Sequence, residues 1–189
     1  MAEVRAARDA DVAAICDICE RAYPATYTGL VSSDYLDRML AEFYQPDRVA
    51  KAIAPAPPDW LGYQVVEEQS QVVEEQSQVI EEQSQVIEEQ SRVVGVAAGG
   101  ITSPGSGELF MLYLEPGERG RGLGTLLLDR VTEQLRELGA TEMWVAALEG
   151  NKLGLPFYEA RGFVRQSRRK AYGTTDAEDY WSLLLRRPI

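Results

Sequence analysis

The 189-residue sequence contains no histidine. An enzyme built from this chain therefore lacks the Ser–His and Cys–His pairs that drive nucleophilic catalysis in many hydrolases. Any proton transfer must depend on carboxylates, tyrosine, lysine, cysteine, backbone groups or water.

Cysteine is also scarce: Cys16 and Cys19, in the segment CDIC, are the only two. A CxxC pair can be a redox dithiol or half of a zinc site. Zinc needs four ligands, and with no histidine and no other cysteine we expect no metal site. The surrounding segment predicts an amphipathic helix with Val12, Ile15, Cys16 and Cys19 on one face. This pattern favours two small buried side chains over either chemical role.

Long apolar runs and a basic excess are missing too. No run approaches the ~20 residues that a membrane span needs, and the first residues carry early acids, unlike a signal peptide. We therefore expect a cytoplasmic protein with no membrane partner. The net charge of −11 argues against a nucleic-acid partner. The length suits a single domain over residues 1–189.

Residues 64–91 repeat one heptad four times: QVVEEQS, QVVEEQS, QVIEEQS and QVIEEQS. The repeat holds eight glutamates and no basic residue, so subtracting it from the net charge of −11 leaves −3. Removal of residues 71–91 would join two strand-like segments through a polar turn, which indicates a tandem repeat inserted in a strand–strand hairpin. Its Glu and Gln favour helix, although adjacent Val and Ile pairs form a poor coiled-coil seam. We expect a partly helical excursion.

The rest of the chain alternates between helical and strand-like patterns, which predicts an α/β (α+β) domain around a mixed sheet. Asp9 is a candidate cap for the first helix and Pro24 a candidate stop after Tyr23. The expected strands cover residues 3–6, 60–66, 92–102, 108–114, 142–148, 163–166 and 180–186. The expected helices cover residues 9–23, 32–42, 123–138 and 151–161, with a short one from residue 46.

A glycine-rich loop, EPGERGRGLG at residues 115–124, lies between a strand and a strong helix. Glycines let the backbone approach a ligand, and the N–H groups at a helix start favour phosphate. Arg119 and Arg121 add cationic donors. The loop lacks the Lys-Ser/Thr of a P-loop and lies too late in the chain for a dinucleotide fold. A surface helix start could show the same glycines, so the loop alone leaves both readings open.

Two motifs together resemble the GNAT superfamily of acyl-CoA N-acyltransferases. Residues 119–124, RGRGLG, match the family's Arg/Gln-x-x-Gly-x-Gly/Ala loop. Residues 151–163, NKLGLPFYEARGF, are similar to its Asn-x-x-Ala-x-x-Phe-Tyr-x-x-x-Gly-Phe segment, with Gly154 where alanine is usual. The resemblance covers nearly everything except the repeat. It implies the GNAT fold, a central mixed and mostly antiparallel sheet flanked by helices.

The resemblance also implies acetyl-CoA as co-substrate. Its pantetheine would lie along Leu112, Tyr113 and Leu114, where this strand splays from the one at residues 142–148. Asn151 would hydrogen-bond the pantetheine arm. The pyrophosphate would lie in the backbone cradle of Arg119, Gly120, Arg121, Gly122, Leu123 and Gly124.

The implied reaction is attack of a primary amine, on a small molecule or a peptide, on the acetyl thioester within a ternary complex. Tyr158 matches the family tyrosine that protonates the leaving thiolate. A carboxylate that some members carry five residues before the Asn is replaced here by Ala146. We therefore take Glu108 as the candidate general base, with Glu149 as runner-up.

The acceptor pocket is expected around Tyr23, Tyr27 and Thr28, together with the last strands. Many members are dimers, so a homodimer is expected. An alternative of another class is a CoA-binding module without turnover whose repeat acts in assembly. Asn151 and Tyr158 argue against that alternative, and the sequence does not identify the amine.

Overall fold

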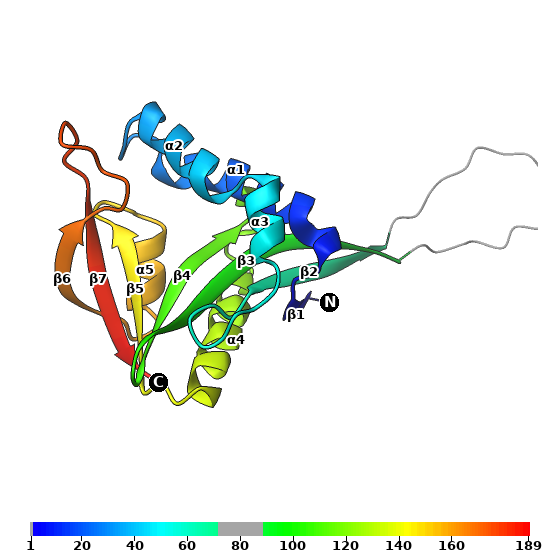
Figure 1. Cartoon of the computed structure of the whole chain (residues 1–189). Coiled ribbons are helices and arrows are strands. Elements are labelled where there is room, and N and C mark those ends of the chain that lie inside the picture. Colours follow the sequence, from blue (N-terminus) through cyan, green and yellow to red (C-terminus); the bar gives the residue numbers. More distant parts are fainter. Residues whose placement is uncertain (1, 72–88) are drawn as a thin grey trace, which may run out of the picture.

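In the computed structural model, which describes residues 2–71 and 89–189, the described strands form one seven-stranded sheet in the order β1-β2-β3-β4-β5-β7-β6 (Figure 1). All neighbouring strands are antiparallel except β4 and β5, which are parallel. The predicted mixed, mostly antiparallel sheet is confirmed. The strands are β1 (Ala2–Ala6), β2 (Tyr63–Gln71), β3 (Glu89–Ser103), β4 (Ser106–Leu114), β5 (Glu142–Leu148), β6 (Val164–Lys170) and β7 (Trp181–Pro188).

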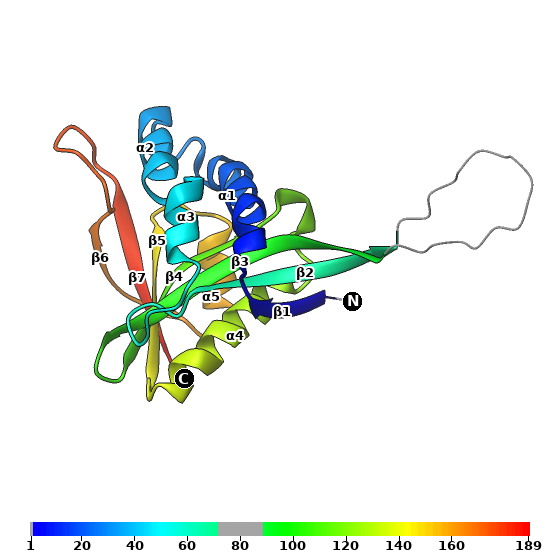
Figure 2. The ribbon, with the colours of Figure 1, turned by 45° about the vertical axis from the view of Figure 1, so that its right-hand side comes forward.

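Helices cover both faces of the sheet (Figure 2). The helices are α1 (Val12–Tyr27), α2 (Ser33–Phe43), α3 (Pro46–Ala52), α4 (Leu123–Glu137) and α5 (Gly154–Glu159), with short 3-10 turns at Asp9–Asp11 and Pro116–Glu118. The first three lie over one face, and α4 and α5 lie against the other. Val65 and Val66 of β2 show the two-sided burial, because both have 0% exposure but each belongs to the core of a different face. Within the described ranges, no helix is long and apolar enough to cross a membrane.

Both cysteines pack into the core beneath α1, as the sequence predicts. Burial raises the pKa of each thiol, so both stay protonated and inert.

Helix α1 departs from the sequence prediction at both ends. It continues through Pro24 to Tyr27, because the Thr28 N–H still donates to the Pro24 carbonyl and Tyr23 is anchored in the core. The missing proline N–H is tolerated when tertiary packing holds the helix. At its start, Asp9 does not cap the helix but lies in a 3-10 turn. The turn is held by buried Asp11, which accepts hydrogen bonds from the Arg5 side chain and the Arg8 N–H.

Strand β2 extends further into the repeat than predicted. It pairs with β3 from Tyr63 opposite Ala98 to Gln71 opposite Glu89, with an irregularity after Val66. An ion pair between Arg5 and Glu67, at 2.8 Å, supports this extension from β1. A partly helical excursion is expected from the sequence over the repeat at residues 64–91. Its described ends, residues 64–71 and 89–91, are strand, and residues 72–88 lie outside the described residues. The insertion itself stays a prediction.

A bulge in β4 changes which face of the sheet its side chains occupy. Ala98 pairs with Met111 but Gly99 pairs with Leu109, so Phe110 has no partner on β3. One extra residue shifts the alternation of side chains between the two faces. Leu109 consequently joins the core on the α4 side, whereas Met111 joins the core on the α1 side. The parallel pairing of β4 with β5 also ends here, at Leu109 opposite Val145.

Candidate active site

Two cavities meet where β4 and β5 part. The first, of about 390 Å³, is bordered by the glycine-rich loop and α5, and we call it the loop cavity. The second, of about 620 Å³, lies between β4 and helices α1–α3, and we call it the aromatic cavity. Five residues line both: Tyr27, Phe110, Met111, Tyr113 and Ala146. The two cavities are therefore adjacent and share these side chains as a common wall.

The glycine-rich loop presents backbone donors to the loop cavity. Gly120 and Gly122 have φ angles of 81° and 83°, in the left-handed region that glycine adopts without strain, and Gly122 is the N-cap of α4. From Arg119 to Gly124, no backbone N–H has an acceptor among the described residues. Unpaired N–H groups at the start of a helix, here one of 15 residues, favour the binding of an anion.

The two loop arginines have different roles. Arg119 lines the loop cavity and donates to Thr26 Oγ1 at 3.2 Å. Arg121 instead forms ion pairs with Glu68, at 2.7 Å, and with Glu118, and it does not line the cavity. The Leu123 side chain is in the core, with 2% exposure, so only its backbone can face a ligand. The structure therefore leaves one of the two predicted cationic donors beside the cavity.

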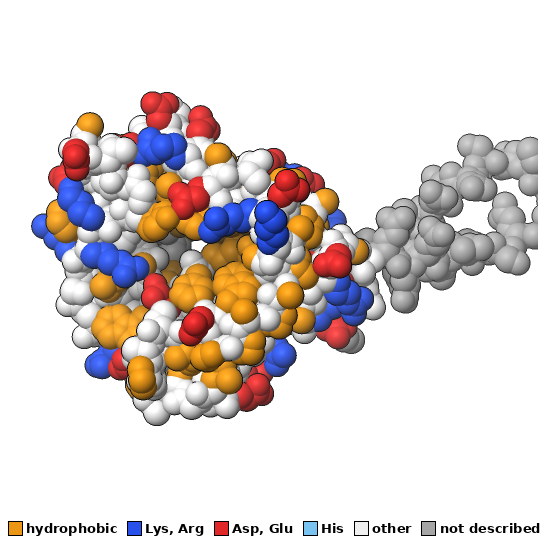
Figure 3. All heavy atoms as spheres, in the orientation of Figure 1, with side chains coloured by type: hydrophobic (Ala, Val, Ile, Leu, Met, Phe, Trp, Pro, Cys, Tyr) orange, Lys and Arg blue, Asp and Glu red, His pale blue; other side chains and the backbone are white. Residues whose placement is uncertain are grey.

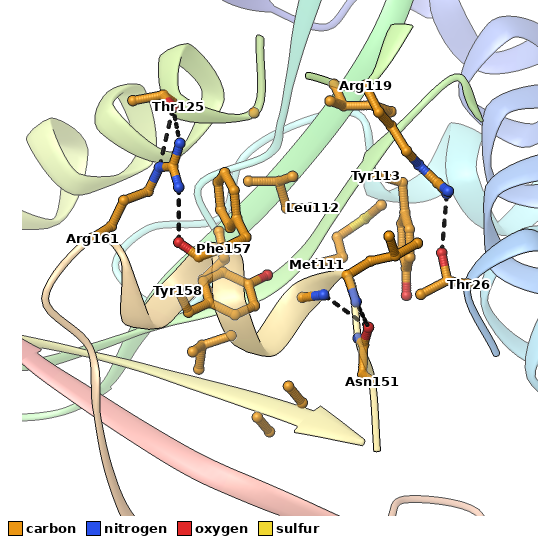
Figure 4. A pocket seen from close by; sticks show the side chains of 18 of the residues that line it. Thr26, Met111, Leu112, Tyr113, Arg119, Thr125, Asn151, Phe157, Tyr158 and Arg161 are labelled. Atoms are coloured by element: carbon orange, nitrogen blue, oxygen red, sulfur yellow. Dashed lines mark hydrogen bonds between the residues drawn. The ribbon is translucent and has the colours of Figure 1, made fainter. Parts of the chain in front are cut away.

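Asn151 is buried in the wall of the loop cavity (Figure 4). Its Oδ1 accepts hydrogen bonds from the N–H groups of Leu153, at 3.1 Å, and Gly154, at 2.8 Å. With the oxygen engaged, the amide offers its Nδ2 donors to the cavity. A side chain at position 154 would place its Cβ 2.6 Å from that nitrogen. The unusual glycine therefore suits this orientation of Asn151.

Tyr158, on α5, points its hydroxyl into the loop cavity toward β4 (Figure 4). The ring is buried against Phe157 and Phe163, and no described residue hydrogen-bonds the hydroxyl. Burial, with a smaller contribution from nearby Tyr27, raises the pKa of Tyr158. The side chain is therefore a neutral proton donor across the physiological pH range.

Glu108 lines the aromatic cavity and not the loop cavity. Its side chain is 20% exposed, and its carboxylate lies 3.6 Å from the Arg169 guanidinium. Burial raises the pKa of Glu108, and Arg169 opposes part of that shift. The runner-up base, Glu149, is 50% exposed, pairs loosely with Arg168 and lines neither cavity.

Of the expected acceptor residues, Tyr23 and Tyr27 line the aromatic cavity but Thr28 does not.

Sequence reasoning missed Arg161, which stabilises one wall of the loop cavity. Its guanidinium donates to Thr125 Oγ1 at 2.6 Å and to the Phe157 carbonyl at 2.8 Å. It also lies 3.8 Å from the Phe157 ring centroid, within cation–π range. Arg161 lies just beyond the end of α5 at Glu159, so no helical spacing in the sequence identified this contact.

The strands of a mixed sheet thus part beside unpaired backbone N–H groups and next to an aromatic cavity, an arrangement that suits a phosphate-bearing ligand. Residues 39–163, more than half of the chain, match the Acetyltransferase (GNAT) family, and the chain belongs to that family.

Two curated relatives are similar to parts of the chain. Ribosomal protein bS18-alanine N-acetyltransferase from Salmonella typhimurium is 27% identical over 81 residues, which cover 43% of this chain and 55% of the relative. Mycothiol acetyltransferase from Beutenbergia cavernae is 34% identical over 68 residues, covering 36% of this chain and 23% of the relative. The chain therefore matches about half and about a quarter of the lengths of these relatives.

A solved structure supports the fold over the full length. PaiA N-acetyltransferase from Thermoplasma acidophilum, in complex with coenzyme A, has a TM-score of 0.73 and 17% identity. The match covers 100% of this chain and 99% of that chain.

Proposed function

We propose that this protein is an acetyl-CoA-dependent N-acetyltransferase that transfers the acetyl group to a primary amine of a small molecule or peptide by direct attack in a ternary complex. The observation that carries the proposal is the shared wall of the two cavities at the parting of β4 and β5. A thioester in the loop cavity and an amine in the aromatic cavity would meet across that wall. Family membership and the names of the relatives support the same activity.

The residues of the loop cavity suit coenzyme A. The free N–H groups from Arg119 to Gly124, with the Arg119 guanidinium, are donors for a pyrophosphate. Beyond Leu109, no strand among residues 2–71 and 89–189 pairs with the β4 edge on the β5 side, so backbone groups of residues 112–114 are available to the amides of pantetheine. Asn151 adds a donor from Nδ2. Bound here, acetyl-CoA would supply the electrophilic thioester.

The chain's own groups account for the proton transfers. Tyr158 donates its hydroxyl proton to the sulfur as the C–S bond breaks. Glu108, directly or through water, accepts the proton that the attacking ammonium loses before its nitrogen forms the new C–N bond. A backbone N–H from the unpaired edge of β4 stabilises the negative charge that builds on the carbonyl oxygen.

The test is thiol release from acetyl-CoA by the purified full chain over a panel of primary amines. Release that depends on the amine, with formation of the acetylated amine, supports the proposal. Coenzyme A binding without turnover on any amine would favour the alternative, a binding module whose repeat acts in assembly. The cytoplasmic location and the homodimer stay predictions.

A further inference from the structure

The aromatic cavity is unusually rich in rings. Ten aromatic side chains line it, from elements as distant in sequence as α1 and the β6–β7 loop, among them Tyr35, Phe43, Trp60 and Phe110. Figure 3 shows a hollow on this face with hydrophobic side chains inside and charged side chains on the rim. Such a surface binds apolar, flat groups, because burying them removes apolar area from water and allows ring–ring contacts.

The cavity is preformed by contacts between its walls. The Tyr35 hydroxyl donates to the Tyr172 carbonyl at 2.7 Å, which ties α2 to the β6–β7 loop. The Arg38–Glu178 ion pair, also at 2.7 Å, joins the same two elements. A volume of about 620 Å³ lies within the range of roughly 300–1,000 Å³ that is typical of small-molecule pockets. The walls therefore favour a small ligand that fits an existing shape.

Few charged side chains line the aromatic cavity, and bases outnumber acids among them. Glu108 is the acid among the lining residues, and Arg48 and Arg169 are the bases. The Glu108 carboxylate receives no hydrogen bond from a described residue, and its nearest cation, Arg169, is 3.6 Å away and 57% exposed. A partly buried carboxylate without donors is stabilised by a ligand that brings an ammonium group. A lining with two arginines and one carboxylate disfavours a ligand with several positive charges.

We propose that the acceptor is a primary amine with a single positive charge, carried on an aromatic or similarly bulky apolar body. The ring occupies the aromatic cavity, and the ammonium faces Glu108. This inference rests on the proposed function, since it names the amine that the acetyl group reaches.

The first test measures binding without turnover. Trp60 lines the cavity, so its fluorescence reports occupancy when amines are titrated into the full chain without acetyl-CoA. We expect 2-phenylethylamine to bind with an affinity at least ~10-fold greater than its uncharged analogue 2-phenylethanol, since only the amine forms a charge-assisted hydrogen bond with Glu108. Glu108→Gln should abolish this preference. The signal should be lost in Trp60→Phe and kept in the control Trp181→Phe, which lies outside the cavity lining.

The second test compares kcat/KM for 2-phenylethylamine, ethylamine and spermidine. Burial of the ring should favour 2-phenylethylamine over ethylamine by roughly 10- to 100-fold. Ala52→Leu, which narrows the cavity from α3, should reduce that ratio and leave coenzyme A binding in the loop cavity unchanged. Phe43→Ala, which widens it, should also reduce the ratio through lost ring contacts.

The outcomes of these tests distinguish the proposed acceptor class from the proposed acetyltransferase function. Equal binding of amine and alcohol, or a preference for ethylamine or spermidine, overturns the assignment of the acceptor class but leaves an acetyltransferase. Selective binding of 2-phenylethylamine with no turnover of any amine overturns the enzymatic function and supports the amine site.

Discussion

The Asn151 side chain accepts hydrogen bonds from the N–H groups of Leu153 and Gly154, and a Cβ at position 154 would come within 2.6 Å of its Nδ2. The two residues therefore depend on each other. Gly154 leaves space for the amide, and the amide orients the turn into α5 while keeping two N–H donors directed at the loop cavity.

Gly154→Ala should displace the Asn151 amide and weaken coenzyme A binding. The loss of about one hydrogen bond, ~1 kcal/mol, predicts an increase in Kd of roughly 5-fold, with little change in kcat. Calorimetric titration with coenzyme A measures the Kd, and Lys152→Ala, an exposed position in the same turn, is the control. An unchanged Kd would mean that Asn151 does not contact the ligand.

Tyr158→Phe should lower kcat at least ~100-fold and leave coenzyme A binding intact, because the variant removes the proton donor but keeps the buried ring. Tyr180→Phe, which removes a hydroxyl that accepts the Ser32 N–H outside both cavities, is the matched control and should retain activity. Steady-state kinetics together with coenzyme A titration make the comparison. If Tyr158→Phe keeps the wild-type rate, the thiolate takes its proton from another donor.

Glu108 should impose an acid limb on the pH profile of kcat/KM. As the base it works only when ionised, and burial raises its pKa, so activity should rise with pH through a value above that of an ordinary glutamate. Glu108→Gln should remove this limb and lower kcat/KM by ~100-fold or more. A variant with the same rate and the same profile as the wild type would exclude Glu108 as the base.

The raised pKa of Glu108 should also make the stability of the folded protein depend on pH. Because the pKa of Glu108 is raised in the folded state, the native protein binds more protons than the unfolded chain between the ordinary and the raised value. Stability should therefore decrease as the pH rises through that window. Glu108→Gln should have a higher Tm than the wild type at neutral pH, and the difference should shrink as the pH falls toward the ordinary carboxyl range. Thermal denaturation at several pH values gives the comparison, and a difference independent of pH would contradict it.

The loop arginines should differ in their effect on coenzyme A. Arg119→Ala removes a cation from the loop cavity and should raise Kd by ~10-fold, an effect that weakens at high salt. Arg121→Ala removes a guanidinium that pairs with Glu68 and Glu118 outside the cavity and should change Kd by less than about 3-fold. Titrations of both variants at two salt concentrations test the contrast, and equal losses would contradict the assignment.

Local chemistry was predictable where a short segment carries its own signal. Ser32 caps α2 and accepts the Tyr35 N–H, Pro46 opens α3, and β5 has the predicted bounds Glu142–Leu148. The RGRGLG loop was recognisable because helix starts with glycines have the same backbone donors in any surroundings. The extension of α1 past Pro24 was not predictable, since core packing outweighed the local cost of proline.

Side-chain direction at the site was decided by contacts across the sheet. The bulge at Phe110 exists only in the pairing of β4 with β3, and it places Glu108 in the aromatic cavity while Leu112 lines the loop cavity. The position of Arg121 was likewise decided by Glu68, a residue 53 positions away in sequence. No local pattern contains such pairings, because they depend on which strands become neighbours.

The residue pattern by itself therefore indicated the family and predicted the anion loop and the candidate acid Tyr158, all of which depend on short contiguous motifs. The tertiary structure alone decided the aromatic cavity, whose walls run from Tyr23 to Ser182. Its composition follows from long-range packing, which brings rings from separate helices and strands around one carboxylate. The acceptor class can therefore be inferred from the folded chain, because the groups that recognise the amine are neighbours in space and not in sequence.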